Sequence, residues 1–239
     1  MALPKLNTTF AYDMTLPLNG KTYKYRPYLV QEEKMLLVAG ESKDPTASMK
    51  AMRDILNACV QNLRADDLAM ADVEYAFIQL RAKAAGEVTT VQSACDECEH
   101  VSEITINLED IVVLDETADM LRFTVGDSIG VTMRHPTLQD VLRNPKIVST
   151  EKSDRVDSMF TMIDIVIDTV EFGDECEKFS AQPLADRTEF VGTMNQEQFS
   201  HVRKFLEAMP SAKLPISFKC PKCGHVNEKV LTGIQNFFG

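Results

Sequence analysis

The chain repeats one short pattern at two distant places, Ala94-Cys95-Asp96-Glu97-Cys98-Glu99-His100-Val101 and Lys219-Cys220-Pro221-Lys222-Cys223-Gly224-His225-Val226. Both segments read C-x-x-C-x-H-V and lie between short runs in which apolar and polar residues alternate. A knuckle of this kind turns two thiols toward one point, so two knuckles together supply a complete tetrahedral zinc site. The pattern predicts a structural zinc site whose four ligands are Cys95, Cys98, Cys220 and Cys223.

The two cysteine pairs lie about 120 residues apart, far beyond the usual spacing within a zinc ribbon. An insertion between the two halves of a ribbon accounts for this gap. We therefore predict an α+β fold with three parts. Residues 1–87 form an N-terminal β-hairpin and helices, residues 88–110 with 214–239 form a split zinc-ribbon-like β element, and residues 111–213 form an inserted lobe, first β and then mainly helical.

Other interpretations of the cysteines stay open at this point. A redox dithiol normally needs a thioredoxin-like βαβ context, which is missing from this pattern. His100 or His225 could replace a thiol as a ligand, although each follows its second cysteine by only two residues. The pairs could also remain separately reduced without metal. Of the two lone cysteines, Cys59 is expected in the core on an apolar helix face, and Cys176 is expected at the surface among acidic neighbours.

The N-terminal part begins with a predicted hairpin, because Asn19-Gly20 suits a type I′ turn between Leu16–Leu18 and Thr22–Tyr25. Three helices follow. The first runs from Pro27 to about Gly40, and the third ends at Gly86. Apolar residues at helical spacing mark the second and third helices: Met49, Met52, Leu56, Cys59 and Leu63, then Met70, Val73, Phe77 and Leu80.

After the first knuckle, residues 111–135 continue as β structure, and residues 137–213 read as mainly helical. An apolar stripe at helical spacing runs from Val156 to Val170, although Ile163–Ile167 also alternates and could be a strand. The last helix is clearer, because Asn195 followed by Gln198 matches a capping box and Pro210 ends the pattern.

Charge and hydropathy exclude several classes of function. The formal net charge is −11 and the isoelectric point is about 4.9, so the surface repels phosphate backbones and nucleic acid is not an expected partner. No apolar run approaches the roughly 20 residues that cross a bilayer, and the first residues lack the pattern of a secretory signal. We expect a cytosolic product with reduced thiols and no membrane partner.

The sequence contains none of the common catalytic motifs. There is no phosphate-binding loop, dinucleotide-binding turn, nucleophile elbow or H-E-x-x-H zinc motif. Of the four histidines, two lie beside the cysteine pairs, and neither His135 nor His201 has a patterned partner in the sequence. We therefore expect no enzymatic activity and no small-molecule substrate.

Three further stretches carry a family resemblance: Tyr25-Arg26-Pro27-Tyr28-Leu29-Val30-Gln31-Glu32-Glu33-Lys34-Met35-Leu36-Leu37, then Phe77-Ile78-Gln79-Leu80-Arg81-Ala82-Lys83-Ala84-Ala85-Gly86-Glu87, and the C-terminal knuckle ending in Leu231-Thr232-Gly233-Ile234-Gln235-Asn236-Phe237-Phe238. In order and spacing they resemble the baseplate hub subunit and assembly protein family of T-even-type contractile-tailed phages. The resemblance implies a structural component of the tail baseplate at its hub, or alternatively a non-virion chaperone that assists hub assembly.

The resemblance also implies partners and a location. The partners are other baseplate and tail proteins, and the chain is placed in the virion, with the host cytoplasm as its location during assembly. Two segments are candidate interfaces. Arg26–Lys34 combines aromatic residues with an arginine, although Arg26 could instead pair with an internal carboxylate. The apolar tail Ile234–Phe238 could dock into a neighbour or fold back onto the ribbon.

Overall fold

The computed structural model describes residues 9–42, 44, 46–126, 128–148 and 155–233 of the chain. The fold is α+β, as predicted. It consists of two compact units. Unit 1 comprises Met1–Lys43, Ala47–Leu114 and Ser211–Gly239, and unit 2 comprises Asp44–Thr46 and Asp115–Pro210. In sequence, most of unit 2 is thus an insertion in unit 1. The finer three-part division at residues 87, 110 and 213 stays a prediction, and the tail Ile234–Phe238 lies outside the described residues.

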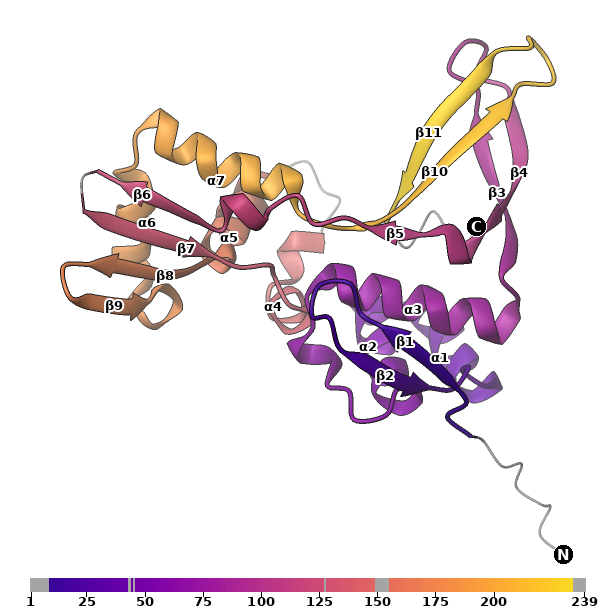
Figure 1. Ribbon diagram of the computed structural model, residues 1–239, viewed down its shortest axis with the longest axis horizontal. Helices are drawn as coiled ribbons and strands as arrows, with labels where there is room; N and C mark the ends of the chain where they lie inside the picture. Colours follow the sequence, from indigo (N-terminus) through magenta and orange to yellow (C-terminus); the bar gives the residue numbers. More distant parts are fainter. Residues whose placement is uncertain (1–8, 43, 45, 127, 149–154, 234–239) are drawn as a thin grey trace, which may run out of the picture. The chain divides into compact units, whose positions relative to one another are not determined.

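In its described residues, unit 1 contains a hairpin, three helices and two longer hairpins (Figure 1). In chain order its elements are β1 (Tyr12–Thr15), β2 (Thr22–Tyr25), α1 (Val30–Gly40), α2 (Ala47–Cys59), α3 (Met70–Ala85), β3 (Val88–Ala94), β4 (Val101–Asn107), β5 (Val112–Val113), β10 (Ala212–Lys219) and β11 (Val226–Thr232). Strands β1 and β2 pair with each other, as do β3 and β4, and the third sheet has the order β11-β10-β5. All pairings are antiparallel.

The first hairpin exists as predicted, but its turn is different. Beyond the pair Thr15↔Thr22, the Leu16 N–H donates to the Lys21 carbonyl and the Gly20 N–H to the Leu16 carbonyl, both at 3.0 Å, so the turn has four residues, 17–20, instead of the two of a type I′ turn. Gly20 has a positive φ of 65° and Asn19 does not. The cause is tertiary, because the buried carboxylate of Asp72 in α3 accepts the backbone N–H groups of Leu18 (2.9 Å) and Asn19 (3.1 Å).

Helix α1 packs on unit 1 through a charged residue, since Glu32 is its one buried side chain among the described residues. Glu32 is 3% exposed and pairs with Arg26 Nη2 at 3.0 Å. On its other side the helix exposes apolar residues, including Val30 (79% exposed) and Leu37 (66%). The structure therefore places Arg26 inside, paired with an internal carboxylate, and not at the surface as the candidate interface required.

The two long hairpins of unit 1 share one apolar core with α3. The β3–β4 ladder runs from Val88↔Asn107 to Ala94↔Val101, and the β10–β11 ladder from Lys213↔Thr232 to Lys219↔Val226. The apolar side chains that α3 and the hairpins bury together are Ile78, Ala82, Val91, Ile106, Leu108, Ile111, Ala212, Leu214 and Ile216. Since both ladders end at a cysteine knuckle, the shared core brings the two knuckles to the same end (Figure 1).

Unit 2 consists of a four-stranded antiparallel sheet and helices. Its elements are β6 (Arg122–Val125), β7 (Ile129–Met133), α4 (Leu138–Arg143), α5 (Arg155–Val166), β8 (Ile167–Phe172), β9 (Glu175–Lys178), α6 (Leu184–Gly192) and α7 (Gln196–Ala208). The sheet order is β6-β7-β8-β9. Its core includes Val131, Ile163, Val166, Val202 and Phe205. The predicted N-cap of α7 is confirmed, because Asn195 Oδ1 accepts the Gln198 N–H at 2.9 Å.

The mainly helical prediction for residues 137–213 is wrong between Ile167 and Lys178. The helix α5 ends at Val166 and the chain passes directly into β8, which turns at Gly173 into β9. The residues Ile167, Thr169 and Val170 are β-branched and favour a strand. Pairing with β7 on one side and β9 on the other decides the outcome, and sequence periodicity alone does not report such long-range pairing.

The start of α4 in unit 2 supplies a testable prediction. Asp140 accepts Arg134 Nη1 at 2.6 Å and the Thr137 N–H at 2.9 Å. Burial raises the pKa of Asp140, but the hydrogen bonds to Arg134 and Thr137 outweigh it and hold the pKa below its usual range. We expect Asp140→Asn to destabilise unit 2 by about 1–3 kcal/mol, measured by urea unfolding followed by circular dichroism.

The pH dependence of this effect has a fixed sign. Because the folded-state pKa of Asp140 is depressed, its contribution is present above the unfolded pKa of about 3.9 and is lost as the pH falls through the folded value. The matched control is Asp157→Asn, since Asp157 is exposed and lies 3.7 Å from Lys146. Its effect should stay within about 0.5 kcal/mol, and equal losses in both variants would contradict the assignment.

Candidate metal centre

The two knuckles adopt the same backbone conformation. In the first, Cys95 N–H donates to the carbonyl of His100 (2.9 Å) and Glu99 N–H donates to the carbonyl of Cys95 (2.9 Å). In the second, Cys220, Gly224 and His225 repeat both bonds at 2.8 and 2.9 Å. The fifth position of each pattern has a positive φ, 56° at Glu99 and 79° at Gly224. The repeated sequence therefore encodes a repeated local structure.

The four knuckle sulfurs form one cluster. All four Sγ atoms lie within 4.8 Å of one another. Two close pairs join opposite knuckles: Cys95 Sγ lies 3.6 Å from Cys223 Sγ, and Cys98 Sγ lies 3.6 Å from Cys220 Sγ. Four thiolates at roughly 2.3 Å from a tetrahedral zinc ion would be about 3.8 Å apart. The donor set and its spacing thus fit a closed structural zinc site.

The protonation of the cluster also fits a cation. Burial raises the pKa of Cys95, but hydrogen bonds from the backbone N–H groups of Cys98 and Glu97 outweigh it and lower that pKa to about 6. At Cys223 a hydrogen bond from the His225 backbone lowers the pKa, while burial and the neighbouring sulfurs raise it to about 12. Four thiolates in one place repel each other, and a bound cation removes this repulsion.

Asn227 is a part of the site that sequence reasoning missed. It is 1% exposed, its Nδ2 lies 3.6 Å from Cys95 Sγ, and its Oδ1 accepts the Asp96 N–H at 2.9 Å. A side chain of β11 in the second hairpin thus holds the knuckle of the first hairpin. Its only signal in the sequence is its place directly after the second repeat, where the first repeat has Ser102. Nearby, Lys229 Nζ pairs with Asp96 Oδ1 at 2.7 Å.

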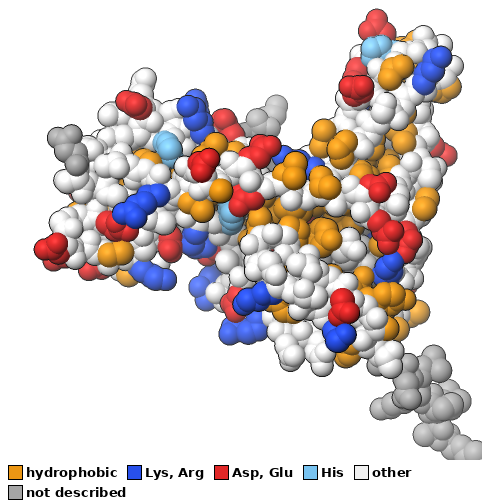
Figure 2. All heavy atoms as spheres, in the orientation of Figure 1, with side chains coloured by type: hydrophobic (Ala, Val, Ile, Leu, Met, Phe, Trp, Pro, Cys, Tyr) orange, Lys and Arg blue, Asp and Glu red, His pale blue; other side chains and the backbone are white. Residues whose placement is uncertain are grey.

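The structure distinguishes the four cysteines from the two histidines that were the alternative ligands. Neither His100 nor His225 belongs to the sulfur cluster. Cys95 and Cys220 are buried, whereas Cys98 is half-buried and Cys223 exposed. Figure 2 shows acidic, basic and histidine side chains together at this end of the hairpins. The predictions for the lone cysteines are confirmed. Cys59 is fully buried, which raises its pKa to about 11, and Cys176 is exposed.

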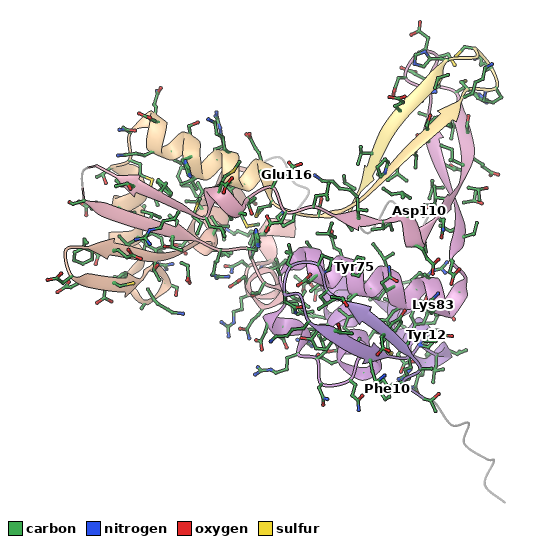
Figure 3. The ribbon with its side chains drawn as sticks, in the orientation of Figure 1. Phe10, Tyr12, Tyr75, Lys83, Asp110 and Glu116 are labelled. Atoms are coloured by element: carbon green, nitrogen blue, oxygen red, sulfur yellow. The ribbon has the colours of Figure 1, made fainter. Side chains whose placement is uncertain are left out.

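The opposite end of the β3–β4 hairpin is anchored to α3 by Lys83. Its Nζ pairs with Glu87, directly before β3, and with Glu109 Oε1 (2.9 Å), just after β4. It also lies 5.8 Å from the ring centroid of Tyr12 in β1, toward which it points (Figure 3). Hydrogen bonds to Glu87 and Glu109 raise the pKa of Lys83. One lysine therefore joins the start of β3 and the end of β4 at the open end of the hairpin that carries the first knuckle.

A polar cluster in unit 2 resembles a catalytic constellation but has different chemistry. Thr117 Oγ1 lies 2.7 Å from His135 Nε2 and donates to Asp115 Oδ1 at 2.6 Å. Because the hydroxyl proton is committed to Asp115, the histidine nitrogen donates to the Thr117 oxygen and does not act as its base. Thr117 is fully buried, and the His135 ring stacks on Phe205 at 5.8 Å. The sequence had shown no partner for His135, and the structure supplies Thr117, Phe205 and Asp115, whose Oδ1 lies 3.8 Å from His135 Nε2.

Fold and site together define an α+β protein with a four-cysteine cluster that joins the middle of the chain to its C-terminal hairpin. Residues 9–239 match the family described as T4 bacteriophage base plate protein, and the chain belongs to this family. The comparison confirms the resemblance read from the sequence. No curated protein and no solved structure gives a significant match. In the described part of the chain, no helix is both long and apolar enough to cross a membrane.

Proposed function

We propose that this chain is a structural component of the hub region of the phage tail baseplate, and that it acts through contacts with other baseplate and tail proteins during tail assembly. The family match over residues 9–239 carries the proposal. The proposal locates the chain in the virion, after assembly in the host cytoplasm, and includes no enzymatic activity, nucleic-acid binding or small-molecule substrate. The net charge of −11 supports the exclusion of nucleic acid.

The proposal assigns the four-cysteine cluster a mechanical role. Cys95, Cys98, Cys220 and Cys223 are its zinc ligands, and all four positions of a tetrahedral ion are taken by thiolates, which leaves no open position for a reacting water. The clustering of both pairs favours this assignment over a redox dithiol, which needs only one pair. The metal would join residues more than a hundred positions apart in a rigid pair of hairpins.

The alternative is a chaperone that binds a hub protein during assembly and then leaves. Quantitative mass spectrometry of purified particles of the phage that encodes this chain separates the two. We expect the chain at a fixed, stoichiometric copy number relative to known baseplate proteins. Its absence from intact particles, together with its presence in unassembled baseplate intermediates from the same lysate, would replace the structural proposal with the chaperone.

A further inference from the structure

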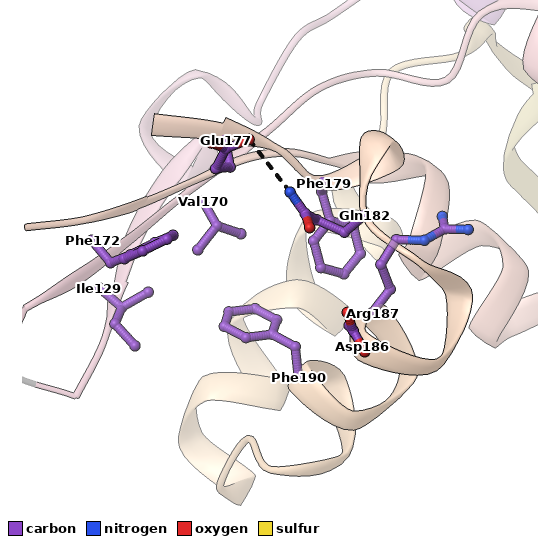
Figure 4. Close-up of a pocket in the computed structure, with 9 residues that line it drawn as sticks. All are labelled: Ile129, Val170, Phe172, Glu177, Phe179, Gln182, Asp186, Arg187 and Phe190. Atoms are coloured by element: carbon purple, nitrogen blue, oxygen red, sulfur yellow. Dashed lines mark hydrogen bonds between the residues drawn. The ribbon is translucent and has the colours of Figure 1, made fainter. Parts of the chain in front are cut away.

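Unit 2 contains an apolar cavity of about 300 Å³ between one face of its sheet and the segment that follows β9 (Figure 4). On the sheet side lie Val170 and Phe172 of β8. Phe179 and Phe190 lie opposite, with ring centroids 5.8 Å apart in an edge-to-face arrangement. This volume is at the lower end of the range for ligand pockets, about 300–1,000 Å³. It suits one large apolar side chain.

The mouth of the cavity is apolar and acidic. Phe172 is 43% exposed, which is unusual for a phenylalanine that lines a cavity. Glu177 and Asp186 lie at the rim, Asp174 lies in the adjoining β8–β9 turn, and Glu175 begins β9. Among the described residues none of these four carboxylates has an ion pair, whereas the nearby Arg187 is paired with Asp164. A ligand at this mouth therefore meets uncompensated negative charge.

The strand beside the cavity has a free edge. Strand β9 is the last strand in the order β6-β7-β8-β9, and in the described part of the chain no strand pairs with its outer side. Alternate backbone N–H and C=O groups of such an edge point outward and can pair with a further strand. In the register of the sheet, Val170 lies opposite Glu177 and Phe172 opposite Glu175. A segment added at β9 thus runs beside both the apolar mouth and the acidic side chains.

We propose that this surface, formed by the cavity and the outer edge of β9, binds an extended basic segment of another protein, which inserts one phenylalanine- or leucine-sized side chain into the cavity. Backbone pairing with β9 supplies affinity, and the side chain in the cavity supplies specificity, as in other cases of strand addition. Lysines or arginines two residues before and two residues after the apolar residue lie on the same face of the added strand, and so face Glu175, Glu177 and Asp186. The inference goes beyond the proposed function and does not depend on zinc.

The test uses the full chain and a fluorescein-labelled nonapeptide, Lys-Thr-Lys-Thr-Phe-Thr-Lys-Thr-Lys, in which the lysines lie on the same strand face as the central phenylalanine. We expect saturable binding by fluorescence anisotropy at low salt, weakened by added salt because the contacts are charged. Phe172→Ser, and separately the double variant Glu175→Lys with Glu177→Lys, should each weaken binding about tenfold. A peptide with glycine at its centre should lose binding to the same extent.

Two matched variants serve as controls. Phe160→Ser removes a phenylalanine of similar exposure (48%) that does not line this cavity. Glu116→Lys together with Asp119→Lys makes the same charge change as the double variant, at two exposed residues outside the cavity, of which Figure 3 labels Glu116. Both should bind the peptide as the parent chain does. The proposal is overturned if the parent chain shows no saturable binding up to about 1 mM peptide, or if the controls weaken binding equally.

A second copy of this chain is the competing occupant. Sedimentation of the chain alone should show no self-association that depends on Phe172. A concentration-dependent dimer that Phe172→Ser abolishes would assign the surface to a second copy and overturn the proposal. Because Phe172 lies in unit 2, this result leaves the zinc content and the particle experiment unaffected.

Discussion

Cys95→Ser and Cys220→Ser should each remove the zinc from the entire site and destabilise unit 1 by at least about 4 kcal/mol, the stabilisation that a ligand supplies at about 1,000 times its Kd. Structural zinc in finger peptides binds with an apparent energy of about 10–16 kcal/mol, so the effect is the largest expected in this protein. Either serine destroys the common site, because Cys95 and Cys220 come from different knuckles and both contribute a buried sulfur.

Elemental analysis and tyrosine fluorescence measure this effect. The parent chain should contain about one zinc per molecule, and both variants none. All five tyrosines lie in unit 1 and the chain has no tryptophan, so tyrosine fluorescence during urea unfolding reports on the unit that holds the site. Asn227→Ala should have a zinc affinity between those of the parent chain and of the serine variants. We expect it to be lowered about 10–100-fold, the usual effect of removing a residue that orients a ligand.

Three controls make the zinc prediction specific. Cys176→Ser removes an exposed thiol in unit 2, and His100→Ala and His225→Ala remove the imidazoles next to the knuckles. All three should keep the metal. Two zinc ions per chain, an intact fold without any metal, or loss of zinc in His225→Ala with retention in Cys220→Ser would each show that the four-thiolate site is wrong.

Glu32→Ala should destabilise unit 1 by about 3–5 kcal/mol, because it leaves the buried guanidinium of Arg26 without its partner. The carboxylate also accepts the Leu29 N–H at 2.7 Å and so caps α1. Since Glu32 is the one buried side chain of α1 among the described residues, the variant should release this helix first. Amide exchange in Val30–Gly40 should accelerate, and tyrosine fluorescence should report earlier unfolding in urea.

The double variant Arg26→Met with Glu32→Leu is the matched control. Replacing a whole buried ion pair by apolar residues of similar volume is often neutral or stabilising, so the double variant should be clearly more stable than Glu32→Ala. Burial raises the pKa of Glu32, but the hydrogen bonds to Arg26 and Gln31 outweigh it and lower the pKa. The ion pair therefore contributes above an unfolded pKa of about 4.3, and the contribution is lost as the pH falls through the folded value. A double variant no more stable than Glu32→Ala would contradict this account.

The sequence predicted local structure correctly where hydrogen bonds between residues close in sequence form it. The Asn195 capping box, the end of α3 at Gly86 and both knuckles depend on hydrogen bonds over a few residues. The predictions were wrong where the local conformation depends on contacts with residues far away in sequence. Asp72, more than fifty residues away, accepts two backbone N–H groups of the first hairpin loop. Pairing with β7 places the end of the apolar stripe Val156–Val170 in the strand β8. Periodicity within a short window carries no information about such partners.

The same distinction between local and long-range contacts applies to the candidate metal site. The sequence by itself determined the two knuckles, because a repeated C-x-x-C-x-H-V segment forms its turn from its own backbone bonds. Only the tertiary structure decided that the four sulfurs meet within 4.8 Å, since that depends on the core which the two hairpins and α3 bury together. It also placed Asn227 against Cys95 and opened the cavity beside β9. Contacts of this kind join residues that no local pattern links, and burial in a common core brings them together.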